Sequence, residues 1–194
     1  TVTGLLAVKT GQYNKGIQLA NEELKNHELL KATYPGPQEH FEFRKVALQK
    51  NLGQAYLAAG LFDPAKSWLE KSQTGFSTLH PDFKPKALEQ SILGSLSELS
   101  VKKGDLTPAK SDQLKRIEIL ESDNQINLVE RIKAYTAMIK ITTERGELEE
   151  AQQWVEKANS QILSKSLDTS DFPGVLAANL ALLQVSGKGN EAKE

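Results

Sequence analysis

The sequence predicts an all-α protein in which antiparallel helix pairs stack into an α-solenoid. Three observations predict this fold. A six-residue phrase that begins with glycine recurs five times along the 194 residues. Apolar residues beside the phrase recur at the three- and four-residue steps of a helix, and no segment alternates as a strand does. Recurrence at a period of about 20–50 residues indicates a repeat architecture.

The recurring phrase is a glycine, four variable residues and then a small residue. The copies are Gly11–Gly16, Gly60–Ala65, Gly104–Ala109, Gly146–Ala151 and Gly187–Ala192, with starting glycines 49, 44, 42 and 41 residues apart. The chain's two tryptophans, Trp68 and Trp154, each lie eight residues after the glycine of their copy. This coincidence indicates that the copies are repeats of one structural unit.

Each unit is expected to be a helix, a tight turn and a second helix. The glycine suits the left-handed residue just past a helix end, a conformation that other residues adopt at a cost. Asp63-Pro64 and Thr107-Pro108 resemble an N-cap followed by proline in the first turn of the next helix. The small sixth residue predicts a point where the two helices cross closely. Apolar stripes at helical spacing mark the first helices: Leu48, Leu52, Ala55 and Ala59; Leu88, Ile92, Leu96 and Leu99; Leu128, Ile132, Tyr135 and Ile139.

Polar and proline-containing segments separate the units. They predict loops between about nine or ten helices. These segments are Tyr34–Pro37, His80–Pro85, Glu121–Asn124 and Thr169–Pro173.

One copy resembles the tetratricopeptide repeat. The segment from Leu52 to Ala65 matches the family phrase Leu-Gly-x-x-Tyr-x-x-x-Gly-x-aromatic-x-x-Ala at every position. The other copies keep little beyond an apolar residue, the turn glycine and the small residue. The aromatic that the family places early in its first helix is Gln49 in this copy, Leu93 in the third and Tyr135 in the fourth.

The long spacing is similar to the repeats of about 42 residues in kinesin light chains and in helical sensor domains of bacterial regulators, rather than to the usual repeat of about 34 residues. The resemblance covers the whole chain. It implies a right-handed superhelix whose first helices line a concave groove that holds a partner peptide.

The repeat is cut at both ends of the sequence. Gly11 leaves room for about half of a first helix, and the chain stops at Glu194, just inside the second helix of the fifth unit. Stacked repeats need capping at their ends. We therefore expect residues 1–194 to be a single repeat domain of about five repeats, the first and last incomplete. It is expected to come from a longer protein or to self-associate through its open ends.

Composition excludes several classes of function. With 24 basic and 25 acidic residues the net charge is −1, which argues against a nucleic-acid binder. The absence of cysteine excludes disulfides and thiolate chemistry. The longest apolar stretch, residues 175–185, is too short to cross a bilayer. No signal peptide is visible, although the chain begins at Thr1 rather than methionine. These features favour a cytoplasmic protein.

No set of residues predicts catalysis. His27, His40 and His80 do not pair at metal-ligand spacing, and exposed surface positions are expected for them. No phosphate-binding loop, nucleophile elbow or dinucleotide-binding glycine pattern occurs. We therefore expect no enzyme activity, no metal ion and no other cofactor.

By the resemblance, function rests on the surface of the first helices. The groove positions of the family fall on Lys50, Gln54 and Ala58, on Glu98 and Lys102, and on Lys133, Thr136 and Lys140. The four lysines form a mildly basic strip suited to an acidic peptide or a C-terminal carboxylate. A row of solvated lysines is the alternative. The family's clamp for chaperone tails is not supported, because Gln54 and Ser95 stand where it needs asparagine.

The sequence thus predicts a non-catalytic scaffold that binds a partner protein or peptide in its concave groove. The alternative is a ligand- or peptide-sensing regulatory domain of a larger signalling or transcription protein.

Overall fold

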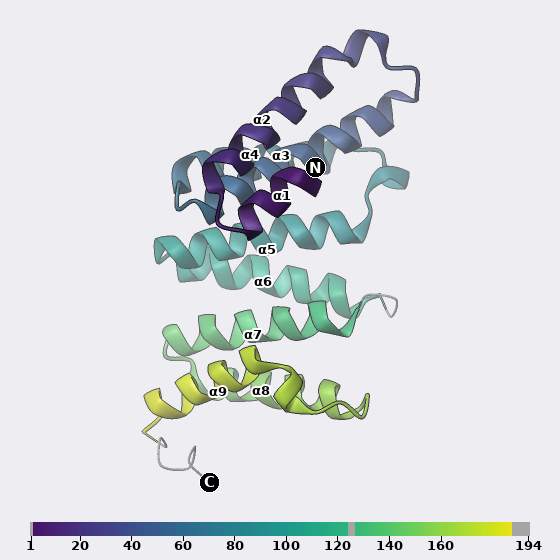
Figure 1. Ribbon diagram of the computed structural model, residues 1–194. Coiled ribbons are helices and arrows are strands. Elements are labelled where there is room, and N and C mark those ends of the chain that lie inside the picture. Colours follow the sequence, from purple (N-terminus) through teal and green to yellow (C-terminus); the bar gives the residue numbers. More distant parts are fainter. Residues whose placement is uncertain (1, 124–126, 188–194) are drawn as a thin grey trace. The chain divides into compact units, whose positions relative to one another are not determined.

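The computed structural model describes residues 2–123 and 127–187 (Figure 1). Within these ranges the chain forms α-helices and three short 3-10 turns and contains no strand, which confirms the all-α prediction. The helices are α1 (Val2–Lys9), α2 (Tyr13–Leu29), α3 (Gln38–Ala58), α4 (Phe62–Thr78), α5 (Lys86–Lys103), α6 (Leu106–Glu121), α7 (Leu128–Glu144), α8 (Leu148–Leu163) and α9 (Pro173–Val185). The loops predicted between repeats connect α2 to α3, α4 to α5, α6 to α7 and α8 to α9.

All five phrase glycines adopt the left-handed conformation, with φ between 75° and 80°. At Gly60, its own N–H donates to the Leu57 carbonyl and the Leu61 N–H donates to the Tyr56 carbonyl. This is the Schellman pattern, in which a left-handed residue satisfies the last carbonyls of a helix. The same two bonds recur at Gly11, Gly104 and Gly146. The predicted turn chemistry is therefore confirmed.

The predicted N-caps at Asp63 and Thr107 are wrong. The residue directly after each glycine, Leu61 or Asp105, is the N-cap, and neither makes a side-chain capping bond. The Schellman turn reverses the chain within one residue of the glycine. The next helix therefore starts earlier than an N-cap directly before the proline would place it. Asp63 instead places its negative charge in the first turn of α4, where the helix dipole favours an acidic side chain.

The small sixth residue lies at a close helix crossing, as expected. Ala65, Ala109 and Ala151 are fully buried. A Cβ added to Gly16 would lie 2.5 Å from Val8 Cγ2, so even an alanine there would force Val8 to move. Ala192, the fifth small residue, lies outside the described residues.

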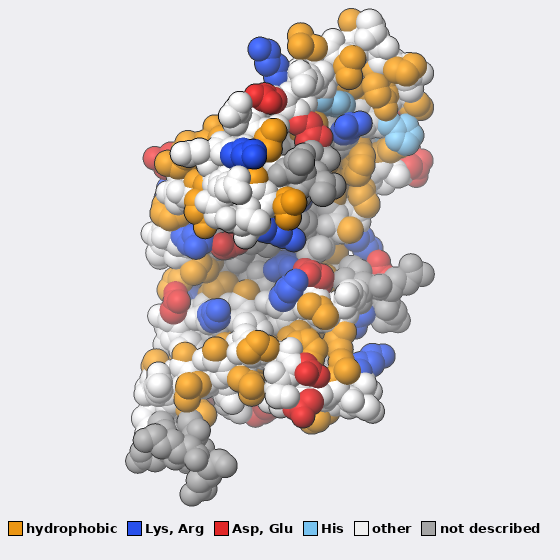
Figure 2. Space-filling model, viewed as in Figure 1, with side chains coloured by type: hydrophobic (Ala, Val, Ile, Leu, Met, Phe, Trp, Pro, Cys, Tyr) orange, Lys and Arg blue, Asp and Glu red, His pale blue; other side chains and the backbone are white. Residues whose placement is uncertain are grey.

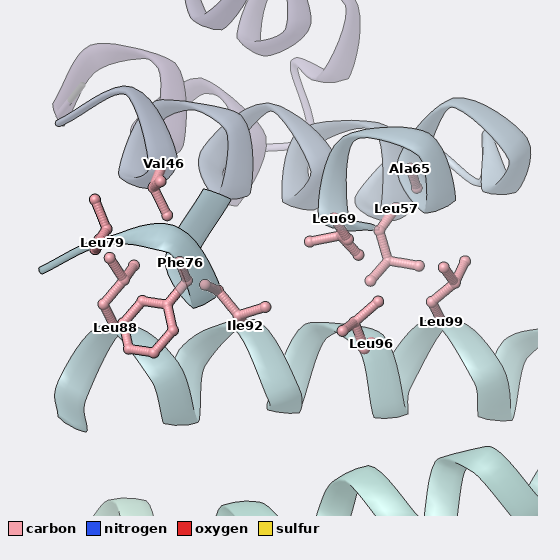
Figure 3. Packing of buried hydrophobic residues seen from close by; sticks show 10 residues of the cluster. All are labelled: Val46, Leu57, Ala65, Leu69, Phe76, Leu79, Leu88, Ile92, Leu96 and Leu99. Carbon is pink, nitrogen blue, oxygen red and sulfur yellow. The ribbon is translucent and has the colours of Figure 1, made fainter. Parts of the chain in front are cut away.

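The chain divides into two compact units, residues 1–99 and 100–194. In unit 1 the core lies between the α3–α4 pair and the first part of α5 (Figure 3). Leu88, Ile92 and Leu96 point from α5 toward the α3–α4 pair, and Phe76 packs among them. Burial of this apolar stripe holds successive repeats together.

Unit 2 has its own core. Tyr135, Met138 and Ile139 on α7 are almost completely buried. They pack with Ile162 of α8 and with Val175 and Ala178 of α9, in two adjacent clusters. α7 thus contributes apolar residues to its contacts with both α8 and α9. That residues 1–194 act as one domain with a right-handed superhelical twist stays a prediction.

The second repeat has a longer first helix than the third and fourth, since α3 has 21 residues where α5 has 18 and α7 has 17. Hydrophobic side chains gather near the α2–α3 connection (Figure 2), where Leu29 and Leu30 are exposed. His27 is buried there, which corrects the expectation of a surface histidine. Its ring stacks on Phe41 at 3.9 Å, and its Nε2 lies 2.9 Å from the Phe41 carbonyl oxygen. A flat, half-apolar ring is buried readily when such a polar partner is available.

Candidate functional site

Two of the predicted groove residues form matched contacts between α3 and α5 in unit 1. Gln54 Nε2 donates to Ser95 Oγ at 2.9 Å, and Lys50 Nζ donates to Ser91 Oγ at 3.5 Å. Ser95 Oγ in turn donates to the Ser91 carbonyl at 3.0 Å. Because residues four apart on a helix share one face, each helix contributes two neighbouring polar groups. We call this set, Lys50, Gln54, Ser91 and Ser95, the α3–α5 polar face.

Lys50 is the electrostatic feature of this face. It is half-buried, and burial lowers the pKa of its ammonium group from the ordinary value of 10.5. Among the residues that the structure describes, no carboxylate pairs with it, and its hydrogen bond to a neutral hydroxyl is long. A partly desolvated cation without a counter-charge is stabilised by any anion that reaches it.

The other predicted positions are distributed over the two units. Ala58 and Glu98 are exposed in unit 1, and Lys102 is exposed in the last turn of α5, in unit 2. Lys102 and Glu98 both engage other groups.

On α7, the predicted residues lie on neighbouring turns of one helix. Lys133 and Lys140 are exposed, and Lys133 Nζ lies 2.7 Å from Glu130 Oε1. Thr136 is half-buried and donates to the Ile132 carbonyl at 2.8 Å. Each unit therefore presents its own predicted residues, and one continuous lysine strip stays a prediction.

Sequence reasoning missed Ser91, which contacts Lys50. The spacing of the residues could have identified it. Ser91 lies 41 residues after Lys50, just as Ser95 lies 41 residues after Gln54, and the two serines are one helical turn apart. Reading that signal requires knowing which residues of α3 and α5 face each other.

The charged cluster of unit 2 has a structural role. Lys110 Nζ lies 2.6 Å from Glu150 Oε2 and 2.9 Å from Glu147 Oε2, which ties α6 to the start of α8 and the turn before it. The hydrogen bond to Glu150 raises the pKa of Lys110, burial opposes this rise, and the hydrogen bond to Glu147 adds to it. The hydrogen bonds from Lys110 and then Arg145 lower the pKa of Glu147. These charges satisfy one another and fix the Gly146 turn.

The described residues offer neither a metal site nor a membrane span. Within residues 2–123 and 127–187, no three His, Asp or Glu side chains cluster closely enough to hold a metal ion. No helix in these ranges has the length and hydrophobicity needed to span a membrane.

Comparison with known proteins identifies the fold. No protein-family model and no curated protein sequence matches the chain. Solved structures do match over 98% of the chain. A kinesin light chain from Podosopora anserina with nearly identical TPR-like repeats has 20% identity and a TM-score of 0.71 over 87% of its length. A variant of that protein gives 19% identity and a TM-score of 0.72 over 86%. BtubC (BKLC) from P. vanneervenii has 14% identity and a TM-score of 0.77 over 72%.

The chain therefore has the fold of kinesin light chain-like tetratricopeptide repeats, which confirms the resemblance inferred from the turn phrases. Helical repeat proteins of this type commonly serve as interaction scaffolds, because their extended surfaces suit the binding of other proteins.

Proposed function

We propose that the chain is a non-catalytic interaction scaffold and that the α3–α5 polar face binds an acidic group of a partner peptide. The observation that carries this proposal is Lys50, a half-buried cation with no carboxylate partner among the described residues. Gln54 and the two serines supply neutral hydrogen-bonding groups beside it. A carboxylate from a partner peptide gains a charge-assisted hydrogen bond there. A cytoplasmic location remains part of the proposal.

The test compares Lys50→Met with Lys25→Met, which removes an exposed lysine of α2. The probe is a fluorescent, glutamate-rich dodecapeptide with a free C-terminal carboxylate, measured by anisotropy at low salt. We expect Lys50→Met to weaken binding about tenfold and the control to change it little. Equal affinity of Lys50→Met and the unaltered chain contradicts the proposal. Lys133→Met and Lys140→Met measure the share of unit 2 separately.

Lys50 also makes a prediction about stability and pH. Its folded-state pKa lies below its unfolded value, so the folded chain is penalised wherever the ammonium group is charged. The penalty is complete below the folded pKa and disappears as pH rises past 10.5. Lys50→Met should therefore raise the thermal midpoint at pH 7, and the gain should shrink toward high pH. A lowered midpoint at pH 7 means that burial of the charge is not costly.

An exposed apolar face on α9 favours a second interaction, which is self-association. Leu176 and Leu180 lie one turn apart on this helix and are each 45% exposed, and hydrophobic side chains gather over this region in Figure 2. We propose that this face pairs with a second copy. Sedimentation velocity should show a concentration-dependent dimer that the Leu180→Glu variant loses. A strict monomer at high concentration rejects this interaction and leaves the acidic-peptide proposal standing.

A further inference from the structure

Unit 1 contains a pocket that is separate from the α3–α5 polar face. It lies between the first half of α3 and the length of α4, and its volume is about 840 Å³. Its lining includes Val46 and Gln49 on α3, and Lys71, Thr74 and Gly75 on α4. This volume is within the range of binding sites for small ligands and short peptide segments, about 300–1,000 Å³.

Gln49 is the unusual residue of this pocket. The residue is only 9% exposed, yet its side chain makes no hydrogen bond with any residue that the structure describes. Gln49 lines the pocket, and its amide atoms are not fully buried. The amide is therefore accessible from the pocket. An amide that opens into a pocket without a protein partner is left to water, and an incoming ligand that pairs with it replaces that water.

Gly75 leaves the space in which this amide is accessible. A Cβ built at Gly75 would lie 2.8 Å from Val46 Cγ2 and 3.6 Å from Gln49 Oε1. A side chain at this position would therefore occupy the volume beside the amide. The glycine on α4 and the glutamine on α3 together form the deep part of the pocket.

The equivalent position of the fourth repeat is filled instead. Counting from the turn glycines, Gln49 corresponds to Tyr135, which is 1% exposed. The Tyr135 ring stacks on Trp154 at 5.8 Å, and its hydroxyl donates to Glu121 Oε1 at 2.7 Å. Gly75 corresponds to Gln161, which carries a long side chain. The fourth repeat thus has larger side chains than the second at both of these positions.

Most of the charged groups that line the pocket have a partner, and the exposed Glu39 is the exception among the described residues. Lys45 Nζ lies 2.8 Å from Glu28 Oε1, and Lys66 Nζ lies 3.8 Å from Glu70 Oε1. Glu42 accepts from Lys31 and from Gln38, and Lys71 lies 4.3 Å from the centre of the Trp68 ring. Because these groups already have partners, a strongly charged ligand gains little, and an uncharged polar ligand is favoured.

We propose that this pocket binds an uncharged, extended segment of a partner polypeptide, with the Gln49 amide paired to one peptide group of its backbone. A primary amide offers an N–H donor and a carbonyl acceptor side by side, which match the backbone C=O and N–H of an extended chain. The site extends the scaffold function to a second surface, and it does not depend on Lys50.

The absence of cysteine permits a sharp test, because any introduced thiol is the only one in the chain. Thr74→Cys places a thiol at the exposed edge of the pocket, and Ser111→Cys places one on the exposed surface of α6 as a control. Each variant is equilibrated with the disulfide form of an N-acetylated, C-amidated Cys-Ala-Ala-Ala peptide. Capture is read by intact mass against increasing 2-mercaptoethanol. We expect capture at Thr74→Cys to resist about tenfold more reductant than at the control.

Variants at Gln49 assign the captured peptide to the amide. In the Thr74→Cys background, Gln49→Leu keeps the side-chain size without hydrogen-bonding groups, and Gln49→Tyr installs the residue of the fourth repeat. Both should reduce capture to the control level while the circular dichroism melt shows a folded chain. If Gln49→Tyr fails to fold, Gln49→Leu alone decides.

Three outcomes overturn the proposal: equal capture at the two thiols, capture that Gln49→Leu leaves unchanged, or stronger capture of Cys-Glu-Glu-Glu or Cys-Lys-Lys-Lys than of the neutral peptide. Lys50→Met in the Thr74→Cys background should not alter capture. Failure of this site is therefore distinguishable from failure of the α3–α5 polar face.

Discussion

The second and fourth repeats, α3–α4 and α7–α8, place a tryptophan at the same position but in different surroundings. Trp154 stacks on Tyr135, its Nε1 donates to Glu150 Oε1 at 3.3 Å, and Lys157 Nζ lies 4.9 Å from its ring centre. Trp68 has only the contact with a lysine, Lys71, in common with Trp154. Its ring packs against a cluster formed by Ala20 and Leu24 of α2 with Leu48 and Leu52 of α3. The missing stack follows from one position on the first helix, which is Tyr135 in one repeat and Gln49 in the other. The missing Nε1 hydrogen bond follows from a position on the second helix, where Pro64 stands in place of Glu150.

A second difference between the two repeats lies at a contact between their first and second helices. In the second repeat Gly53 faces Leu69, and a Cβ on Gly53 would lie 2.7 Å from Leu69 Cγ. The equivalent residues of the fourth repeat are Ile139 and Val155, both buried. A larger residue on the first helix is thus matched by a smaller one on the second. The pair is nevertheless larger in the fourth repeat, because isoleucine adds four carbons to glycine while valine has only one carbon fewer than leucine. These two residues alone therefore do not keep the volume at the crossing constant.

The largest expected effect is the loss of Trp154. Trp154→Ala should destabilise unit 2 by about 3 kcal/mol, at the low end for tryptophan because the ring is only partly buried. Trp68→Ala should cost unit 1 about half as much, because Trp68 lacks the stacked tyrosine. Urea denaturation followed by circular dichroism measures both. Equal losses in the two variants contradict the asymmetry drawn between the repeats.

Installing the residues of the fourth repeat at positions 53 and 69 tests the second difference. Gly53→Ile should destabilise the chain by about 1–3 kcal/mol, because the added side chain overlaps Leu69. Leu69→Val, which installs the partner found in the fourth repeat, should recover part of that loss in the double variant, because it removes one carbon opposite the four that isoleucine adds. A double-mutant cycle gives the coupling energy. Additive losses mean that the two residues do not share one space.

The smallest effect should be the same in both repeats. Gly60→Ala and Gly146→Ala should each cost about 1 kcal/mol, since both glycines have φ of 75° and a Cβ at either meets nothing within 4 Å. The cost is backbone strain alone. Thermal melts of the two variants, with Gly94→Ala in the regular part of α5 as a reference for ordinary helix, measure it. Unequal losses at Gly60 and Gly146 indicate that the turns are not equivalent.

Local features of the chain were sufficient to predict the repeats. A glycine in the left-handed region, a helical apolar stripe and a small residue at a crossing each act within a few neighbouring residues, so their spacing defined the five turns and the fold class. The N-caps were mispredicted by two residues, at Asp63 and Thr107, because the Schellman turn sets where the next helix begins.

The properties of the candidate sites depend instead on which helix faces reach each other across space. Lys50 was identified from the sequence as a groove residue, but its burial, its serine partner and its lack of a carboxylate arise from the packing of α3 on α5. The pocket at Gln49 exists because Gly75 lies opposite it on another helix. Burial and pairing are properties of groups brought together by folding, which spacing along one chain does not encode. For this protein, periodicity therefore establishes the architecture, and the contacts between helices establish where it can bind.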